Sequence, residues 1–213
     1  MPLVISVCGF SNSGKTTLCR EILPILVEGG IDTVYVKHTH ERVLSPEETD
    51  TGILSASSRM VALWGPDGIR VEEKLEGAGP AVVAARFFPG RRLILLEGGK
   101  NLALPKIWVG RVEDIPENVR GIIAFYDRDN PCTRERHFSR GQEKDLAAFV
   151  LSTVRNAEPS PAEVYCGGKR VPAKSFVADF IAGAIRGMLG SLKGDFDTRE
   201  SISIHLRPGK GGK

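Results

Sequence analysis

The sequence has few cysteines, no long apolar run and little net charge, and each shortage excludes a class of protein. Its four cysteines form no Cys-x-x-Cys pair, which favours structural thiols in a reducing compartment. No stretch approaches the roughly 18 consecutive apolar residues that would indicate a membrane span. The net charge of +3 is too small to indicate that the protein binds nucleic acid. We therefore expect neither a membrane protein nor a nucleic-acid-binding protein.

The remaining composition describes a soluble globular protein. Hydrophobic residues make up 41% of the 213 residues and charged residues 26%. This length suits one α/β domain with a small appendage. The N-terminus enters an apolar strand directly, without the cationic and hydrophobic regions of a signal peptide, so we expect a cytoplasmic protein. Cys8 and Cys19 are interpreted as buried small hydrophobic residues.

The stretch from residue 3 to residue 18 organises the rest of the chain. A run of β-forming residues leads into a G-x-x-x-x-G-K-T loop, and a helical pattern follows from Lys15 to about Glu28. This is the P-loop in the strand-to-helix context that it requires, although a glycine-rich turn with an accidental lysine is the alternative. Lys15 would reach the β- and γ-phosphates, where it could also serve catalysis, and the Thr16 hydroxyl would bind Mg²⁺. The predicted nucleotide-binding residues of the loop are Gly9, Ser11, Asn12, Ser13, Gly14, Lys15, Thr16 and Thr17.

A cationic segment follows the second predicted strand, which covers residues 33–37. Lys37-His38-Thr39-His40 falls at the C-terminal end of that strand, the edge where open α/β sheets bind ligands. Lys37, His38 and His40 are therefore candidates for contacting a second ligand, an anion or a pterin. The alternative is that they are ordinary polar loop residues.

Three acidic residues are candidates for metal or base contacts. Glu97 ends the apolar run from Arg92, where a Walker B residue would hold Mg²⁺ or polarise water, so we assign it a metal and a catalytic role. Asp50 lies in the loop after the second strand and could approach Mg²⁺, or simply cap a helix over residues 52–58. Asp127 follows a strand over residues 121–126 and could accept hydrogen bonds from guanine. No N-K-x-D motif occurs, so the residues alone leave guanine and adenine both open.

These patterns predict an α/β protein with the three-layer α/β/α fold of P-loop NTPases over residues 1–156. Helices are expected over 80–88 and 142–154, and strands over 92–97, 106–111 and 121–126. Runs at 59–64 and 68–71, separated by Gly-Pro-Asp-Gly, predict a hairpin. We expect this hairpin to make the mostly parallel central sheet mixed.

A small α+β appendage is predicted beyond a Pro-rich linker at 157–161. It covers residues 162–207, with a strand at 163–166, a turn at 167–168, a helix at 175–192 and an alternating strand at 201–206. The helical spacing of its apolar residues predicts core packing for Phe176, Val177, Phe180, Ile181, Ile185 and Met188. We expect the appendage to dock on the main domain or on a second subunit, and residues 208–213 to be a disordered tail.

Four sequence blocks, in order, resemble the MobB family of molybdopterin guanine dinucleotide biosynthesis. They are Gly9–Thr17, Val36–His40, Leu95–Gly98 and Pro105–Ile107, and together the likeness spans about residues 3 to 150. The Lys-His-Thr-His, Glu-Gly and Pro-Lys-Ile blocks make it far more specific than a P-loop alone. The C-terminal part looks like an extension attached to some family members.

The resemblance implies a GTP-binding homodimer that hydrolyses GTP slowly at most. Such proteins are thought to assist the guanylyltransferase MobA as it attaches GMP to the molybdenum cofactor. Carried over to this chain, Gly9–Thr17 would bind the phosphates and Mg²⁺, and Glu97 would lie near the metal. Asp50 matches an acidic position of the family. However, residues 51–58 contain no arginine where the family often has arginines, so an anion-binding role of those arginines is not carried over to this chain.

Two other functions fit the same P-loop. One is an ATP-using small-molecule kinase, or a ligase resembling dethiobiotin synthetase, which also has an acid-glycine element late in its sheet. The other is a nucleotide-gated carrier in which GTP reshapes the segment from Lys37 to Asp50 to grip a partner or a pterin. A preference for ATP over GTP would support the first of these alternatives.

Overall fold

The fold is built on a parallel six-stranded sheet, seen in a computed structural model that describes residues 1–157, 160–166, 169–194 and 197–206. The strands lie in the order β2-β5-β1-β6-β7-β8, and each neighbouring pair is parallel. Their bounds are β1 Leu3–Gly9, β2 Thr33–Lys37, β5 Leu93–Glu97, β6 Lys106–Val109, β7 Ile122–Tyr126 and β8 His137–Phe138. The predicted strands of the main domain are thereby confirmed.

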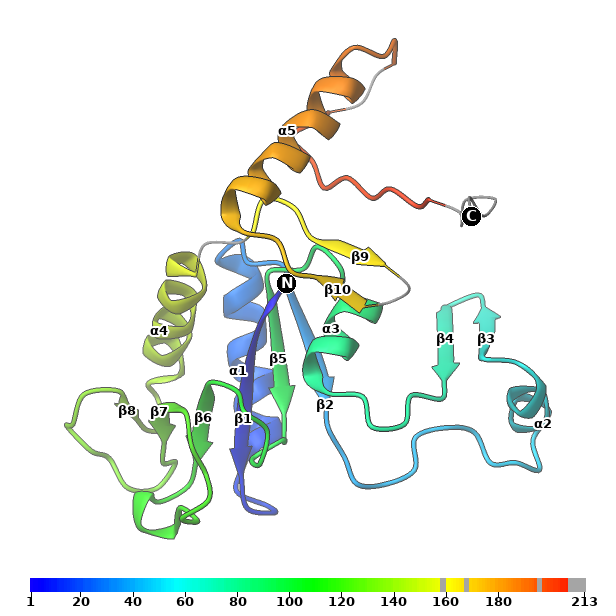
Figure 1. Ribbon diagram of the computed structural model, residues 1–213. Coiled ribbons are helices and arrows are strands. Elements are labelled where there is room, and N and C mark those ends of the chain that lie inside the picture. The colour runs from blue at the N-terminus through cyan, green and yellow to red at the C-terminus, as the bar shows by residue number, and fades with distance from the viewer. Residues whose placement is uncertain (158–159, 167–168, 195–196, 207–213) are drawn as a thin grey trace.

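Helices cover both faces of this sheet (Figure 1). Helices α1 (Lys15–Glu28) and α4 (Glu143–Asn156) pack on the face that carries Ile5 and Val7. Helix α3 (Pro80–Phe87) packs on the opposite face, which carries Val4. This division follows from the two-residue period of a strand, which sends alternate side chains to opposite faces. The predicted three-layer α/β/α arrangement is therefore confirmed.

The predicted hairpin forms but does not join the central sheet. Strands β3 (Met60–Gly65) and β4 (Gly68–Glu73) make a two-stranded antiparallel sheet of their own. Together with α2 (Asp50–Ser57), this hairpin lies apart from the central sheet at the right of Figure 1. The expectation of a mixed central sheet was wrong. The turn pairs the two strands with each other, and nothing in that pairing requires an edge of the central sheet; Trp64 accordingly stays 90% exposed.

The C-terminal part contains the predicted strand and helix but lacks the predicted last strand. Strands β9 (Val164–Cys166) and β10 (Lys169–Val171) pair antiparallel, and α5 (Ser175–Gly190) follows. Residues 201–206 pair with no strand among the residues that the structure describes, so the predicted last strand was wrong. The predicted turn at 167–168 and tail at 208–213 lie outside the described residues. The division of the chain at residues 156 and 162 stays a prediction.

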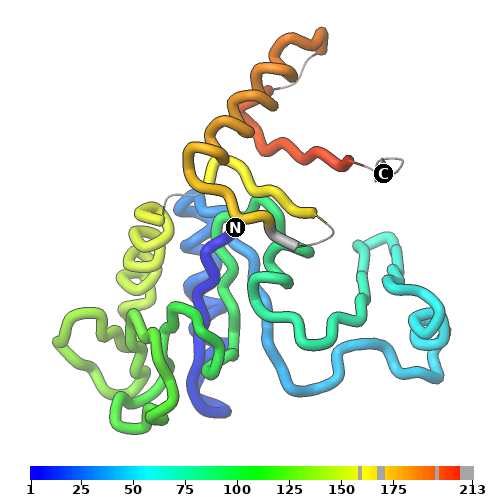
Figure 2. The backbone as a smooth tube through the Cα atoms, in the orientation of Figure 1, coloured from blue at the N-terminus to red at the C-terminus, as the bar shows by residue number. Residues whose placement is uncertain are grey.

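Helix α5 projects away from the central sheet (Figure 2). Core packing was predicted for its large apolar residues, yet Phe176 is 77% exposed, Phe180 69% and Met188 62%. The side chains that it buries are Ala178 and Ala182. Val177 is 42% exposed as well, whereas Ile181 and Ile185 are partly buried. The prediction was therefore wrong for the two phenylalanines, the valine and the methionine, because helical spacing marks an apolar face without showing what covers it.

Two predictions about composition can be compared with the described residues. Cys8 and Cys19 are buried free thiols, as predicted. In the part of the chain that the structure describes, no helix is both long and apolar enough to cross a membrane. The residue just before β9 is tied back to the start of the chain, because the Met1 ammonium forms an ion pair with Glu163.

Replacing Ile22 by alanine tests the core between α1 and the sheet. Ile22 is fully buried, so Ile22→Ala removes packed methyl groups and leaves a cavity, which should lower the free energy of unfolding by about 2–5 kcal/mol. Urea denaturation measures this loss. Ile53→Ala on α2 is the matched control, because Ile53 is 58% exposed and should change stability by less than about 0.5 kcal/mol. Equal losses in the two variants would contradict this assignment of the core.

Candidate nucleotide-binding site

The ends of three parallel strands converge on Glu97. Glu97 lies in register with Val7 of β1 on one side and with Lys37 of β2 on the other. The backbone continues these contacts past the strands: the Gly98 N–H donates to the Val7 carbonyl and the His38 N–H to the Glu97 carbonyl, both at 2.9 Å. The P-loop and the Lys-His-Thr-His segment are thereby brought to one edge of the sheet.

Gly98 holds this edge in a conformation that favours glycine. Its φ is +98°, in the left-handed region, and a Cβ built there would lie 2.7 Å from the His38 carbonyl oxygen. A side chain would therefore be both strained and in contact with the neighbouring backbone. The Ser6 hydroxyl fixes the same residue by donating to the Gly98 carbonyl at 2.6 Å. The Glu-Gly pair is thus required by the close approach of β2 and β5.

The loop between β1 and α1 curls and leaves the start of α1 open. Asn12 and Gly14 adopt left-handed φ values of 60° and 91°. Among the described residues no side chain caps α1, and its first turn contains no acid. Helix α2 differs, because Thr49 caps it by accepting from the Gly52 N–H at 3.1 Å. The uncapped N–H groups of α1 and its positive dipole end therefore form a site suited to an anion.

Two further features of the loop fit a bound phosphate. The Ser13 hydroxyl is buried yet has no hydrogen-bond partner among the described residues. A buried hydroxyl without a partner costs free energy unless a ligand or water supplies one. At the start of the loop, a Cβ on Gly9 would lie 2.2 Å from the Val109 carbonyl oxygen of β6. Gly9 is therefore required because β6 passes directly against the loop.

Lys15 and Thr16 place a cation and a hydroxyl at the mouth of the loop. The Lys15 ammonium donates to the Phe10 carbonyl at 2.5 Å, across the loop itself. The Thr16 hydroxyl donates to Oε1 of Glu97 at 2.9 Å. Two of the three residues that sequence reasoning associated with Mg²⁺ are therefore in direct contact. Oxygen ligands of this kind are the ones that Mg²⁺ prefers.

The Glu97 carboxylate is almost fully buried and held from the second strand as well. The Tyr35 hydroxyl donates to its Oε2 at 2.7 Å, and the Lys37 ammonium lies 3.7 Å from its Oε1. Burial, followed by the hydrogen bond to Glu97, raises the pKa of the Tyr35 hydroxyl above its ordinary value. Tyr35 therefore stays protonated and remains a donor to the carboxylate.

Sequence reasoning missed Tyr35. The signal that could have found it is parity: Tyr35 and Lys37 are two residues apart on β2, so both side chains lie on the same side of the strand. Parallel pairing then sets that side beside Glu97. The two-residue period within β2 was readable in the sequence, but the register between β2 and β5 was not.

The structure does not bring Asp50 to this edge. Asp50 is the first residue of α2, in the part of the chain that Figure 1 shows apart from the P-loop. The alternative interpretation of Asp50 as a helix cap was wrong, because the capping side chain is that of Thr49. A metal role for Asp50 stays a prediction that no contact in the structure supports.

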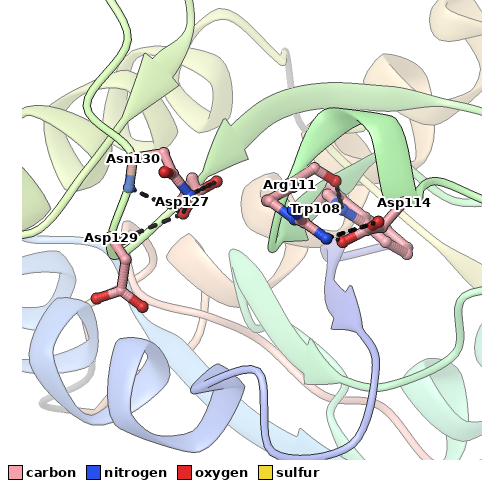
Figure 3. A network of polar contacts seen from close by, with 6 residues as sticks. All are labelled: Trp108, Arg111, Asp114, Asp127, Asp129 and Asn130. Atoms are coloured by element: carbon pink, nitrogen blue, oxygen red, sulfur yellow. Dashed lines mark hydrogen bonds and ion pairs between the residues drawn. The ribbon is translucent and has the colours of Figure 1, made fainter.

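Asp127 is occupied by its own turn (Figure 3). Its Oδ1 accepts from the backbone N–H groups of Asp129 and Asn130, at 3.1 and 3.2 Å, and both its oxygens contact the Asn130 amide. An aspartate that bonds to the backbone two and three residues ahead stabilises a turn. These contacts give Asp127 a structural role, and its predicted contact with a base stays untested.

The two histidines lie beside the edge without contacting the carboxylate. The rings of His38 and His40 are 5.7 Å apart, edge to face, and both residues are exposed. Together with the Lys37 ammonium, these exposed imidazoles form a polar rim at this edge. Their role toward a second ligand stays a prediction.

A parallel sheet with a curled glycine loop, an uncapped helix and a Thr–Glu contact at the strand ends defines the class of P-loop NTPase-like α/β proteins. Within that class, the family model described as molybdopterin guanine dinucleotide synthesis protein B, MobB, matches residues 4–126. The match covers more than half of the chain. The chain belongs to the MobB family.

Individual relatives agree with this assignment. A molybdopterin-guanine dinucleotide biosynthesis adapter protein of Methanocaldococcus jannaschii is 23% identical over 232 residues, covering 95% of this chain and 97% of that protein. A crystal structure of molybdopterin-guanine biosynthesis protein B is 25% identical, with a TM-score of 0.58, and covers 71% of this chain and 99% of its own. The MobB structure from Bacillus subtilis is 24% identical, with a TM-score of 0.53 and coverage of 71% and 97%.

Removing the Tyr35 hydroxyl tests the contacts around Glu97. Tyr35→Phe leaves Oε2 of a carboxylate that is 4% exposed without this donor, so the free energy of unfolding should fall by about 1–3 kcal/mol. Urea denaturation measures the change. Tyr165→Phe is the control, because the Tyr165 hydroxyl makes a longer contact of 3.1 Å with Glu163 and its loss should cost less. A Tyr35→Phe protein as stable as the wild type would show that water replaces the hydroxyl.

Proposed function

We propose that this protein is a GTP-binding accessory protein in the cytoplasm that assists the attachment of GMP to molybdopterin cofactor. Its membership of the MobB family and its likeness to a biosynthesis adapter protein support a place in this pathway. The observation that carries nucleotide binding is the start of α1, where a curled loop and uncapped N–H groups lie beside the Thr16–Glu97 contact. The proposed partner is a guanylyltransferase resembling MobA, which holds the molybdenum cofactor.

Different residues at the P-loop would contact the phosphates and the Mg²⁺ ion. Gly9–Thr17 would cradle the phosphates, and Lys15 would exchange the Phe10 carbonyl for oxygens of the β- and γ-phosphates. Thr16 and Glu97 would hold Mg²⁺, which supplies charge neutralisation at the phosphates when bound. Lys15 needs only to turn from one acceptor to another, because its ammonium already lies at the loop.

The contacts of Glu97 support binding more than fast hydrolysis. Both carboxylate oxygens already contact protein groups, Thr16 and Lys37 at Oε1 and Tyr35 at Oε2. A carboxylate held in this way is suited to fixing a metal and poorly placed to take up a proton from water. We therefore propose hydrolysis far slower than the about 1–100 s⁻¹ typical of kinases. GTP would then report a state to a partner and would not be a substrate for rapid turnover.

Lys37, His38 and His40 would contact a second ligand at the same edge. The Lys37 ammonium is 60% exposed while its other side approaches Glu97, and the two histidines beside it are exposed. This arrangement suits an anionic group such as the phosphate of a pterin cofactor. The His38 N–H donates to the Glu97 carbonyl. A metal bound at Glu97 and an anion bound at Lys37, His38 and His40 would therefore both affect the backbone of this segment.

A homodimer is also part of this proposal. The hairpin exposes large apolar side chains, with Trp64 90% and Ile69 65% exposed. Surfaces of this kind commonly mark protein interfaces. Light scattering of the purified protein at micromolar concentration would give its mass, and a purely monomeric protein would contradict a dimer.

A reconstituted transfer reaction tests the accessory role. A purified guanylyltransferase, molybdopterin cofactor and Mg·GTP are combined with and without this protein, and the guanine dinucleotide product is quantified over time. Faster or more complete product formation, together with GTP turnover by this chain alone below about 1 s⁻¹, supports the proposal. Kinase-like turnover with a small acceptor, or no effect on the transferase, would overturn it.

Lys15→Ala tests the P-loop. Removing the ammonium takes away a charge-assisted contact to the β- and γ-phosphates, so triphosphate affinity should fall about tenfold or more, about 1.4 kcal/mol. Isothermal titration of GTP with Mg²⁺ measures the dissociation constant.

The matched control is Lys100→Ala. The Lys100 ammonium lies 5.4 Å from the centre of the Phe10 ring, close to the loop but outside it. The variant removes the same charge from nearly the same region, so its affinity should change much less. Unchanged GTP affinity in a folded Lys15→Ala protein, or equal losses in both variants, would show that the loop does not grip the phosphates as proposed.

A further inference from the structure

A hollow of about 140 Å³ adjoins the P-loop on the side away from Glu97. Gly14, Thr17, Leu18 and Glu21 form its α1 wall, and the opposite wall consists of Tyr126, Arg128, Arg140 and Glu143. Tyr126 and Arg128 lie at the end of β7, and Arg140 and Glu143 lie between β8 and the first turn of α4. The hollow therefore begins at the phosphate loop and extends between two strand ends, where α/β sheets bind their ligands.

Glu143 presents a charged acceptor in this hollow. Its Oε1 accepts from the Tyr126 hydroxyl at 2.6 Å, and both oxygens share the Gly141 N–H at 3.1 and 3.0 Å. Partial burial alone would raise the pKa of this carboxyl, but the bonds from Tyr126 and from backbone N–H groups outweigh it and lower the pKa. Three donors, the Tyr126 hydroxyl and the backbone N–H groups of Gly141 and Glu143, face a carboxylate with roughly four acceptor positions, so some acceptor capacity remains for a ligand.

The geometry points to this hollow as the site of the purine base, with the Glu143 carboxylate selecting guanine and Tyr126 positioning that carboxylate. The inference rests on the proposed function, in which the P-loop holds a nucleoside triphosphate. A triphosphate fixed at Gly14 and Thr17 leaves its nucleoside to extend along the hollow that those two residues begin.

The chemistry of the two purines decides the selectivity. Guanine presents N1–H and an exocyclic amine side by side, and these donors match the two oxygens of a carboxylate. Adenine presents an unprotonated N1 at that edge, whose lone pair would face the carboxylate. A buried acceptor left unmatched in this way costs binding free energy, which is why hydrogen-bonding sites discriminate strongly.

The two arginines suit the same ligand. Arg128 and Arg140 are 52% and 59% exposed at their side chains, and each has an aspartate contact no shorter than 3.7 Å, both to Asp129. Guanidinium groups that are free to reorient stack on aromatic faces and bind oxygen acceptors. Asp127, the residue that sequence reasoning favoured for the base, does not line the hollow, because its carboxylate faces Asn130.

Titration of wild type and Glu143→Gln with three nucleotides tests the inference. GTP, ATP and xanthosine triphosphate are titrated with Mg²⁺; the xanthine base carries an oxygen in place of the exocyclic amine of guanine. We expect the wild type to prefer GTP. In Glu143→Gln, GTP affinity should fall about tenfold or more while ATP affinity does not fall. Xanthosine triphosphate should bind the variant better than the wild type, because the glutamine amide donates to the added oxygen.

Two companion variants separate recognition from stability. Asp145→Asn removes a carboxylate from the same turn of α4, but Asp145 is exposed and does not line the hollow, so nucleotide selectivity should stay unchanged. Tyr126→Phe keeps the carboxylate and removes its positioning hydroxyl, so it should lower the preference for GTP over ATP by less than Glu143→Gln does. It also serves if Glu143→Gln fails to fold, because a GTP preference unchanged in Tyr126→Phe then overturns the inference.

The outcomes distinguish this inference from the proposed function. Suppose that the wild type binds GTP, that Lys15→Ala loses this binding, and that Glu143→Gln keeps the selectivity of the wild type. This result overturns the base site and leaves the proposed function standing. Wild-type protein that binds neither GTP nor ATP overturns both. A simultaneous loss of all three nucleotides in a folded Glu143→Gln protein also overturns the inference, since it would show a general role in place of a selective one.

Discussion

The contact between Thr16 and Glu97 is the interaction on which the site depends. It joins the first turn of α1 to the end of β5, and β2 completes the cluster with Tyr35 and Lys37. The parallel register decides that these groups meet. A slip of one residue in β5 would turn its carboxylate to the opposite face of the sheet, toward α3. The packing of apolar strand residues against the helices therefore determines on which face of the sheet the Glu97 carboxylate lies.

The central α/β architecture could be predicted because its signals are local. The strand, glycine loop and helix at the start of the chain are specified within about twenty residues. Buried strands can be recognised in the sequence as short apolar runs. The hairpin at residues 60–73 could also be predicted from its turn, but its position relative to the central sheet could not. The turn chemistry is the same whether the hairpin extends the central sheet or stands apart. Residues 201–206 likewise alternate as a strand does, yet a strand needs a neighbour, and alternation does not supply one.

The same contrast applies to the candidate site. Lys15, Thr16 and Glu97 were found because each occupies a fixed place in a motif or at a strand end. Tyr35 was missed because its role depends on a register between segments 62 residues apart. The predicted role of Asp127 stays untested for a different reason. An aspartate after a strand can bind a ligand or accept hydrogen bonds from its own turn. In the structure the N–H groups of Asp129 and Asn130 donate to Asp127, and the sequence does not show which of the two roles applies.

The uncapped start of α1 would couple the stability of the fold to the binding of the proposed nucleotide. The first N–H groups of any α-helix have no intrahelical partner, and no described side chain caps those of α1. The buried Ser13 hydroxyl in the same loop also has no hydrogen-bond partner among the described residues. A ligand that binds only the folded state adds about 2.7 kcal/mol of stability at a concentration 100 times its dissociation constant. That increment is a large fraction of the 5–15 kcal/mol or so that holds a typical protein together. The supply of such a ligand in the cell would therefore regulate how long the protein survives there, as well as what it does.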